Sequence, residues 1–164
     1  MPLQLLVLRH GHAKHDIPAG GDFARVLRQR GKRAVAALPP IVAALTPDLV
    51  LSSPSQRTRE TVECLGLSVP VVYVDALYLA DTDELLDALR DLAAESEPPR
   101  TVVLVGHNPG LHELVLELTE EPVQNFPPAT LAVLALDIDD WQAIGYSTGR
   151  LESLHLPAEP PSEP

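Results

Sequence analysis

Three histidines and an arginine directly follow the first apolar segment of the chain, in the stretch LVLRHGHAKHD. Such a cluster can serve different kinds of chemistry. His10, His12 and His15 could bind a metal ion together, or they could be ordinary surface residues. Alternatively, one of them could be a nucleophile, with Arg9 beside it to hold an anion. Taken alone, the stretch leaves all three interpretations open.

Residues of the same types recur in two later stretches, where SSPSQR contains Arg57 and GHNPG contains His107 and Asn108. Guanidinium groups match phosphate oxygens with planar pairs of donors. A neutral imidazole can attack phosphorus in line, which gives a phosphohistidine that water then hydrolyses. Arginines and a second imidazolium stabilise the charge that spreads over the transferring phosphoryl group. Because this chemistry requires no metal, we predict a metal-independent reaction without a cofactor.

Other residues in these stretches have simpler interpretations. Ser52 and Ser53 could suggest a serine nucleophile, but neither sits in a nucleophile-elbow pattern, so we predict helix capping instead. His12 and His15 have no cysteine or paired acid nearby, which disfavours zinc. We expect both to be bystanders, with His12 near the pocket mouth. Cys64 is surrounded by no partner motif and is predicted to be a small apolar side chain on a helix.

The elements that must position these residues alternate along the chain. Short apolar runs predict strands at 3–8, 48–52, 70–74 and 101–106, and a hairpin formed by 130–138 and 141–147. Helical patterns cover 28–45 with a kink or split at Pro39 and Pro40, 54–66 after a cap at Ser53, 82–95 and 109–120. This alternation predicts a mostly parallel six-stranded sheet covered on both faces, in which ligands bind beyond the carboxyl ends of the strands. His10, Arg57 and His107 would then meet at one edge.

Charge is distributed unevenly along the 164 residues, whose formal net charge is −11. Residues 1–59 contain nine of the twelve Lys and Arg against three acids, or +6. Residues 60–164 contain three basic residues against twenty acids, or −17, and the two sums recover −11. This asymmetry could be chance clustering on a solvated face, or it could be a local anion site in a protein whose acidic remainder repels bulk polyanions. The net negative charge predicts no nucleic-acid partner.

Length and apolar content predict a single domain over residues 1–156, followed by a Pro- and Glu-rich tail at 157–164 that we expect to be disordered. No signal peptide and no apolar run of membrane-spanning length is recognisable in the sequence. With one cysteine, Cys64, no intramolecular disulfide can form. We therefore expect a cytoplasmic protein without membrane contact, and the sequence does not indicate an oligomeric state.

LRHGHA at 8–13, LSSPSQRTRET at 51–61 and VLVGHNPGL at 103–111 together resemble the histidine phosphatase (phosphoglycerate mutase-like) superfamily. The small size of the chain and the stretch DFARVLRQRG at 22–31 resemble the SixA-type phosphohistidine phosphatase branch of that superfamily. The resemblance runs from residue 3 to about 156. It implies a three-layer α/β/α sandwich in which the strands that bear the two motif histidines are adjacent.

The resemblance also implies roles for matching residues. His10 matches the phosphorylated nucleophile, and Arg9 and Arg57 match the arginines that bind phosphate. His107 matches the second histidine, which contacts the transferring phosphoryl group. Arg25 matches the arginine of the branch motif and is expected to help bind phosphate.

Two further residues complete the expected site. Gly11 is expected to permit a tight exit of the chain close to the phosphate, and Asn108 to join the residues that bind substrate. The sequence departs from the branch motif where Val26 replaces the usual proline and Arg28 the usual threonine. We expect Arg28 to face solvent, because its neighbours form a basic run typical of exposed helix faces.

The general acids of related branches are not recognisable in this sequence. His107 is followed by asparagine rather than by the aspartate of the phytase and acid phosphatase branch, and the acidic segment of the mutases is also absent. Asp81, Asp83 and Glu84 occupy the equivalent region and could supply an acid. Their pattern favours a helix cap at Asp81 or Thr82 with acids in the first turn.

A missing acid favours a substrate whose leaving group needs little protonation, such as phosphohistidine, over an alkyl phosphate. The sequence therefore predicts a phosphatase that acts through phospho-His10 on phosphohistidine of a signalling protein. The alternatives are a phosphatase of a small metabolite, such as a sugar or nucleotide phosphate, and a non-catalytic phosphate-binding module. A metal-dependent hydrolase is the last alternative.

Overall fold

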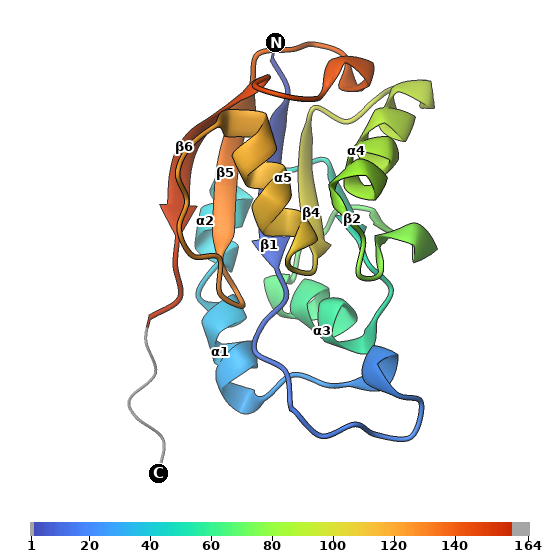
Figure 1. Ribbon diagram of the computed structural model, residues 1–164, viewed down its shortest axis with the longest axis vertical. Helices are drawn as coiled ribbons and strands as arrows, with labels where there is room; N and C mark the ends of the chain where they lie inside the picture. Colours follow the sequence, from blue (N-terminus) through green and yellow to red (C-terminus); the bar gives the residue numbers. More distant parts are fainter. Residues whose placement is uncertain (1, 159–164) are drawn as a thin grey trace.

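The computed structural model describes residues 2–158, and its centre is a sheet with strand order β3-β2-β4-β1-β5-β6 (Figure 1). The strands are β1 (Gln4–Arg9), β2 (Leu49–Ser52), β3 (Val71–Tyr73), β4 (Thr101–Gly106), β5 (Leu131–Leu136) and β6 (Gly149–His155). The first four run parallel to one another, whereas β5 and β6 add two antiparallel pairings at one side. The predicted mostly parallel sheet, with β1 beside β4, is therefore confirmed.

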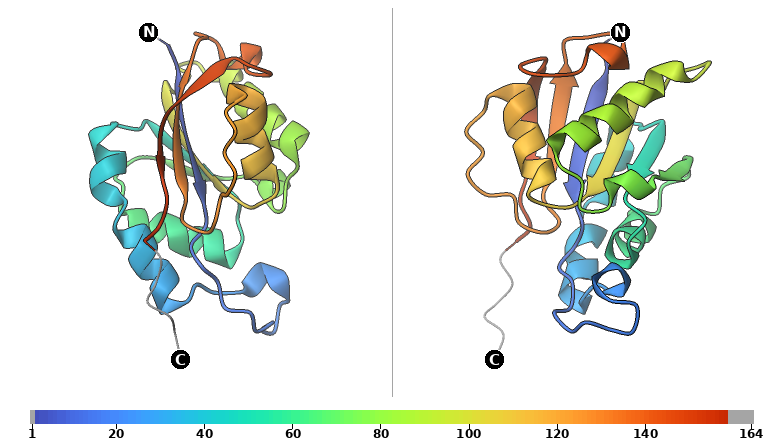
Figure 2. Two further views of the ribbon diagram at one scale, coloured as in Figure 1. Left: turned by 60° about the vertical axis from the view of Figure 1, so that its left-hand side comes forward. Right: turned by 45° about the vertical axis from the view of Figure 1, so that its right-hand side comes forward.

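Helices cover both faces of the sheet (Figure 2). They are α1 (Gln29–Ala36), α2 (Pro39–Ala44), α3 (Gln56–Leu65), α4 (Thr82–Asp91) and α5 (Gly110–Thr119). Helices α1, α2 and α3 pack on one face, and α4 and α5 pack on the other. This gives the expected three layers. No helix in the described part of the chain is long and apolar enough to cross a membrane.

The apolar strands supply both cores because successive side chains point to opposite faces. Along β1, Leu5 and Val7 join the core under α4 and α5, whereas Leu6 and Leu8 join the core under α1, α2 and α3. All four are completely buried. Each such side chain contributes about 1.5–3 kcal/mol by leaving water, so the central strands hold the carboxyl edge rigidly in place.

The predicted helix over 28–45 is split, as its two prolines require. Helix α1 ends at Ala36, and α2 begins with Pro39 in its first turn, where the missing N–H of proline costs nothing. The expected cap at Ser53 is wrong. Helix α3 begins after Ser55, whose side chain accepts a hydrogen bond from the backbone N–H of Thr58. The helix ends at Gly66, which adopts the left-handed conformation.

The second arm of the predicted hairpin is also wrong. The stretch 141–147 forms the short 3₁₀ turn Trp141–Ala143 and a loop, and the strand that pairs with β5 is β6, further along the chain. The reason is burial. Trp141 and Ile144 are each 1% exposed and join the core under α4 and α5. The indole Nε1 also donates to the carbonyl of Pro99 at 2.7 Å, so this segment inserts into the core instead of extending along the sheet.

Two glycines bring the segment after β1 against α1. A Cβ atom on Gly11 would lie 2.8 Å from the carbonyl oxygen of Gly31, closer than real contacts allow. A Cβ atom on Gly31 would overlap the backbone of His12. The two backbones therefore touch directly, and this contact fixes where the chain turns after His10.

Pro157 and Ala158, the first two residues of the expected tail, line a hollow together with Pro127 and Pro128. The rest of the expected tail, residues 159–164, lies outside the described residues.

Candidate active site

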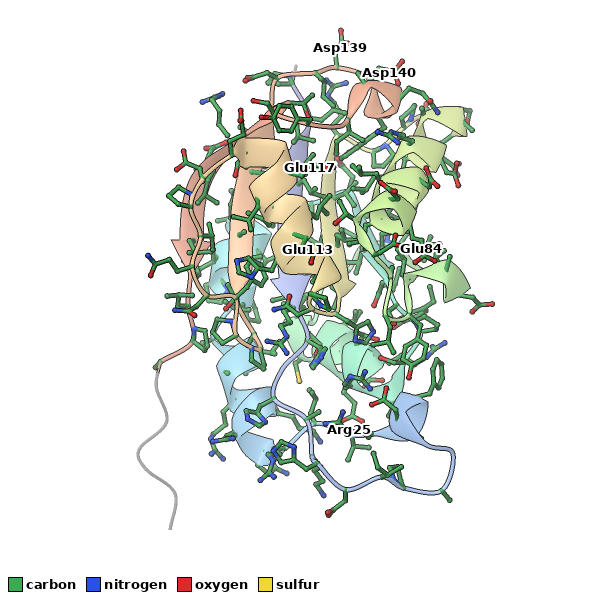
Figure 3. All side chains as sticks on the ribbon, viewed as in Figure 1. Arg25, Glu84, Glu113, Glu117, Asp139 and Asp140 are labelled. Carbon is green, nitrogen blue, oxygen red and sulfur yellow. The ribbon has the colours of Figure 1, made fainter. Side chains whose placement is uncertain are left out.

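A cavity of about 420 Å³ opens beyond the carboxyl ends of β1 and β4. It brings together six of the predicted site residues, namely Arg9, His10, Arg25, Arg57, His107 and Asn108. Figure 3 shows Arg25 below the strand ends, whereas the labelled Glu84 lies higher, on α4. The remaining predicted residue, Gly11, does not line the cavity, and its N–H donates to Thr61 Oγ1 at 3.1 Å.

His10 is held as one defined tautomer. Its Nδ1 lies 2.7 Å from the carbonyl oxygen of Gly11. A carbonyl can only accept, so Nδ1 carries the proton and Nε2 keeps its lone pair. Burial lowers the pKa of His10 to about 4, and the nearby positive charges of Arg57, Arg9 and Arg25 contribute to this lowering. The imidazole is therefore neutral at pH 7 and can act as a nucleophile at Nε2.

His107 lies beside His10, with 5.3 Å between the two ring centroids. Its Nε2 is 2.8 Å from Ser53 Oγ, and its Nδ1 is buried without a hydrogen-bond partner among the described residues. Burial, followed by the neighbouring His10, lowers the pKa of His107 to about 3. Ser53 is thus a positioning partner of His107, which the sequence prediction of a helix cap missed.

Asp22 accepts hydrogen bonds from two arginines of the site, Arg57 on α3 and Arg25 in a loop. Arg57 is buried and donates through Nη1 to the Asp22 carbonyl oxygen at 2.9 Å and through Nη2 to Asp22 Oδ2 at 3.0 Å. Arg25 Nη1 donates to Asp22 Oδ1 at 3.0 Å. The carboxylate thereby joins α3 to the loop that carries Arg25, and it orients both guanidinium groups at the cavity.

Tyr78 completes this network. Its hydroxyl donates to Asp22 Oδ2 at 2.5 Å, and its ring packs edge-on against His107 with 5.6 Å between centroids. The hydrogen bond from Tyr78, together with those from Arg25 and Arg57, holds the pKa of Asp22 far below its usual range. Asp22 and Tyr78 were not predicted as site residues. The available signal for Asp22 was its position three residues before Arg25 in the DFAR stretch.

Arg9 and Asn108 are joined through one backbone carbonyl. Arg9 Nη1 donates to the carbonyl oxygen of Phe126 at 3.0 Å, and Asn108 Nδ2 donates to the same oxygen at 2.8 Å. Arg9 Nε and Asn108 Oδ1 are buried without partners within the described chain. Burial, followed by the charge of Arg57, lowers the pKa of Arg9. Both side chains therefore retain unused hydrogen-bonding capacity at the cavity.

The acids near the start of α4 form a helix cap, as the sequence pattern favoured. Asp81 Oδ1 accepts from the Glu84 N–H at 2.9 Å, and Glu84 Oε1 accepts from the Asp81 N–H at 3.2 Å. This reciprocal pair is a capping box. Neither Asp81, Asp83 nor Glu84 lines the active-site cavity.

His12 and His15 line the mouth of the cavity, with their ring centroids 6.0 Å apart. Arg30 Nη2 lies 2.5 Å from His12 Nε2. Because a guanidinium only donates, His12 accepts at this nitrogen. Within residues 2–158 no group of three His, Cys, Asp or Glu side chains could hold a metal ion. Arg28, expected to face solvent, is half-buried and lies outside the active-site cavity.

Comparisons with known proteins place this geometry in a family. Residues 5–85 match the model of the histidine phosphatase superfamily (branch 1). An uncharacterised Mycobacterium leprae protein, ML1117, is 30% identical, and the match covers 89% of this chain and 98% of that protein. The chain belongs to the histidine phosphatase superfamily.

Within this superfamily the chain is of the SixA type. A solved structure from Nakamurella multipartitia that carries the name phosphohistidine phosphatase SixA superimposes with a TM-score of 0.84 at 27% identity. The match covers 97% of this chain and 100% of that chain. A SixA structure from Agrobacterium tumefaciens gives a TM-score of 0.78 at 28% identity and covers 96% and 100% of the two chains.

The same fold also occurs in a mycobacterial glucosyl-3-phosphoglycerate phosphatase, which is 21% identical with a TM-score of 0.64 and covers 93% of this chain and 98% of its own. The fold alone therefore does not distinguish a protein substrate from a small metabolite. That choice depends on the side chains around the cavity.

Proposed function

We propose that the protein is a metal-independent phosphatase that removes the phosphoryl group from phosphohistidine on a protein, through a phosphorylated His10. The observation that carries this proposal is the lack of a proton donor among the carboxyl groups at the cavity. Asp22 is the one carboxyl residue among the described residues that line it, and Tyr78, Arg25 and Arg57 hold it ionised. An alkoxide leaving group would need a donated proton, whereas an imidazole leaves phosphorus without one from the enzyme.

In the first step, His10 Nε2 attacks phosphorus while the P–N bond of the substrate breaks. The electron pair of that bond stays with the substrate imidazole, which leaves as a neutral base once its other nitrogen carries the ring proton. In the second step, water attacks phosphorus and the bond between phosphorus and His10 Nε2 breaks. The electron pair of that bond returns to Nε2, and both protons of the water remain on the released phosphate, so His10 regains its starting form. The Gly11 carbonyl holds the Nδ1 proton through both steps.

The arginines stabilise the charge on the transferring phosphoryl group. Arg9 ends β1 and Arg57 lies on α3, and both line the cavity with His10. Each retains N–H groups beyond those already bonded. Arg25 adds a third positive charge at the same cavity. A phosphoryl group that gains charge in the transition state is stabilised by such fixed donors without further reorganisation.

His107 contributes a hydrogen bond through Nδ1. The hydroxyl of Ser53 accepts from the backbone N–H of Ser55 at 3.4 Å and can donate to His107 Nε2 at 2.8 Å. With Nε2 accepting, the proton of the neutral ring resides on Nδ1, the nitrogen that has no partner in the described chain. This N–H is suited to a phosphoryl oxygen.

The test is to trap the intermediate. The purified protein is mixed with a histidine-phosphorylated protein, quenched in alkali and measured by intact-mass spectrometry. We expect one acid-labile phosphoryl adduct, which His10→Ala abolishes together with turnover. His155→Gln is the matched control, because His155 contacts Ser153 on β6 and lies outside the cavity, and it should retain the adduct.

Three outcomes would overturn the proposal. Faster turnover of sugar phosphates or nucleotides than of phosphohistidine would identify a metabolite phosphatase. Phosphate binding without turnover would identify a non-catalytic module. Loss of activity in a chelator would identify a metal-dependent hydrolase.

A further inference from the structure

A second hollow, of about 390 Å³, lies next to the active-site cavity and is strongly basic. It is lined by Lys14, Asp16, Arg28, Gln29, Arg30 and Arg33. We call this set the basic hollow. Four of its six residues are basic and one is acidic, although the chain as a whole has a formal charge of −11. The proposed reaction uses none of the four basic side chains.

The basic hollow adjoins the cavity through shared backbone and side-chain contacts. Lys14 lies between Ala13 and His15, which both line the cavity, and its carbonyl oxygen accepts from Arg25 Nε at 2.8 Å. The Arg28 N–H donates to the His12 carbonyl at 2.8 Å. A molecule whose phosphoryl group is bound in the cavity can therefore also contact the basic hollow.

Three of the four basic side chains of the basic hollow form no ion pair with an acid of the described chain. Lys14 and Arg33 are exposed, and Lys14, Arg28 and Arg33 take part in none of the ion pairs among residues 2–158. Figure 3 shows the labelled acids Glu113, Glu117, Asp139 and Asp140 beside the sheet or at its opposite end. A positive surface thus borders the cavity of an acidic protein.

Another part of the cavity surroundings is apolar and exposed. Leu79 lines the cavity and is 54% exposed, and Phe23, next to Asp22, is 43% exposed. Both are large apolar side chains that water covers unless a partner does. Leu79 also has a φ of 52°, a left-handed backbone conformation that is costly for leucine. Retention of strain at an exposed apolar residue is typical of a functional surface.

We propose that the basic hollow, Leu79 and Phe23 form a docking surface for the phosphorylated substrate protein. Acidic residues near the phosphohistidine would lie over the basic hollow, and an apolar residue would contact Leu79 and Phe23. This inference rests on the proposed function and specifies the substrate class. An acidic protein segment is favoured over a nucleic acid or an anionic membrane, because the remaining acidic surface repels extended polyanions.

The test compares three substrates, which are phosphohistidine itself and two histidine-phosphorylated peptides of equal length. One peptide has aspartates and leucines beside the phosphohistidine, and the other has lysines and serines. We expect the wild-type protein to have a kcat/KM about tenfold higher for the acidic peptide, an advantage that falls with salt. The double variant K14E/R33E should lose this advantage and retain its turnover of phosphohistidine.

Two matched variants sharpen the test. Arg100→Glu reverses an exposed charge at the other end of the sheet and should leave the advantage intact. Leu79→Asn removes the apolar side chain and keeps a residue that accepts the left-handed conformation. It should lower the ratio of kcat/KM for the acidic peptide to that for phosphohistidine several-fold.

The outcomes separate the two proposals. Turnover of phosphohistidine and both peptides at equal kcat/KM, unchanged in K14E/R33E, would overturn the docking surface and leave the proposed function standing. Turnover of metabolite phosphates alone would overturn both. Inhibition by single-stranded DNA or anionic vesicles that K14E/R33E relieves, without a preference for the acidic peptide, would replace the docking surface by a general polyanion site.

Discussion

The two ends of the sheet differ in whether their polar groups have hydrogen-bond partners within the protein. At the amino end, Asp48 Oδ2 accepts from the N–H groups of Arg100 and Thr101 at 3.0 and 2.9 Å, and Trp141 donates to Pro99. At the carboxyl end, three side chains that line the cavity have buried polar atoms without partners in the described chain: Arg9 Nε, His107 Nδ1 and Asn108 Oδ1. One end is closed by its own hydrogen bonds, and the other keeps bonding capacity that a ligand can use.

This difference teaches that hydrogen-bond satisfaction, rather than cavity size, identifies the site. A hollow near the amino end, at about 570 Å³, is larger than the active-site cavity at about 420 Å³. Its lining contains no histidine and a single arginine, Arg100, together with the acids Asp48, Glu95 and Glu97. A site for an anion needs unused donors, and these are at the carboxyl end.

Replacement of Arg57 should give the largest difference in activity between substitutions at the two ends of the sheet. Arg57→Ala removes a buried positive charge next to His10, and we expect kcat/KM for phosphohistidine to fall about 10³-fold. Arg57→Lys keeps the charge but loses the planar donor pair, so kcat/KM for phosphohistidine should fall about 10²-fold. Arg100→Ala at the amino end is the control and should retain full activity. Steady-state kinetics with folding checked by circular dichroism measures both, and a fall below tenfold for Arg57→Ala would contradict the assigned role.

Two aspartates, one at each end of the sheet, allow the same comparison. Asp22→Asn removes the charge that orients Arg25 and Arg57, so kcat should fall about tenfold. The inhibition constant of inorganic phosphate should also fall, because a negative charge next to the bound anion is gone.

Asp48→Ala should show the reverse behaviour. It loses two backbone hydrogen bonds at the amino end and about 1 kcal/mol of unfolding free energy, with unchanged kinetics. Denaturant titrations and product-inhibition assays on both variants make the comparison. Equal effects of the two substitutions on kcat would remove the distinction between the ends.

The pH dependence of the unfolding free energy should reflect the two buried histidines at the carboxyl end of the sheet. The folded-state pKa values of His10 and His107 are lowered to about 4 and about 3, from 6.5 in the unfolded chain. Between pH 4 and 6.5 the unfolded state therefore binds more protons than the folded state. Stability should rise with pH across this window and fall on acidification, by about 1.4 kcal/mol per pH unit for each histidine.

The control for this prediction is the double variant H10Q/H107Q, whose unfolding free energy should be flatter over the same window. Urea titrations at a series of pH values measure it. The activity of the wild-type protein should fall below pH 4, where His10 becomes protonated and loses its nucleophilic lone pair. An unchanged slope in the variant would show that other groups dominate the acid response.

The smallest expected effect concerns backbone strain at the cavity rim. Leu79→Asn relieves a left-handed conformation at an exposed residue, and we expect a gain of about 0.5–1 kcal/mol in unfolding free energy. The midpoint of urea unfolding measures this gain. A destabilised variant would mean that Leu79 contributes packing that outweighs its strain.

The sequence predicted those parts of the site that follow from strand order. Arg9, His10 and His107 end or directly follow apolar runs, and parallel strands must bring such ends to one edge. Arg57 follows because a helix begins shortly after β2. These residues were predictable since a short periodic pattern fixes their place relative to the sheet.

The sequence did not predict the residues that support this edge. Asp22 and Tyr78 lie in irregular segments, where neither length nor composition fixes which side chains meet. The sequence predicts Ser53 as the helix cap because Pro54 follows it and suits the first position of a helix, whereas in the structure Ser55 is the cap. The hairpin error at Trp141 has the same origin, since tertiary burial overrides a local strand preference.

The contact between Gly11 and Gly31 offers a way to control activity without replacing any reacting side chain. A methyl group at Gly31 would push α1 away from the backbone of His12, which directly follows the turn after His10. In Gly31→Ala, His10 would then keep its position only at temperatures low enough for α1 to stay packed against the backbone of His12. Such a substitution would give a heat-sensitive allele, with which cells could be shifted from active to inactive protein by warming alone.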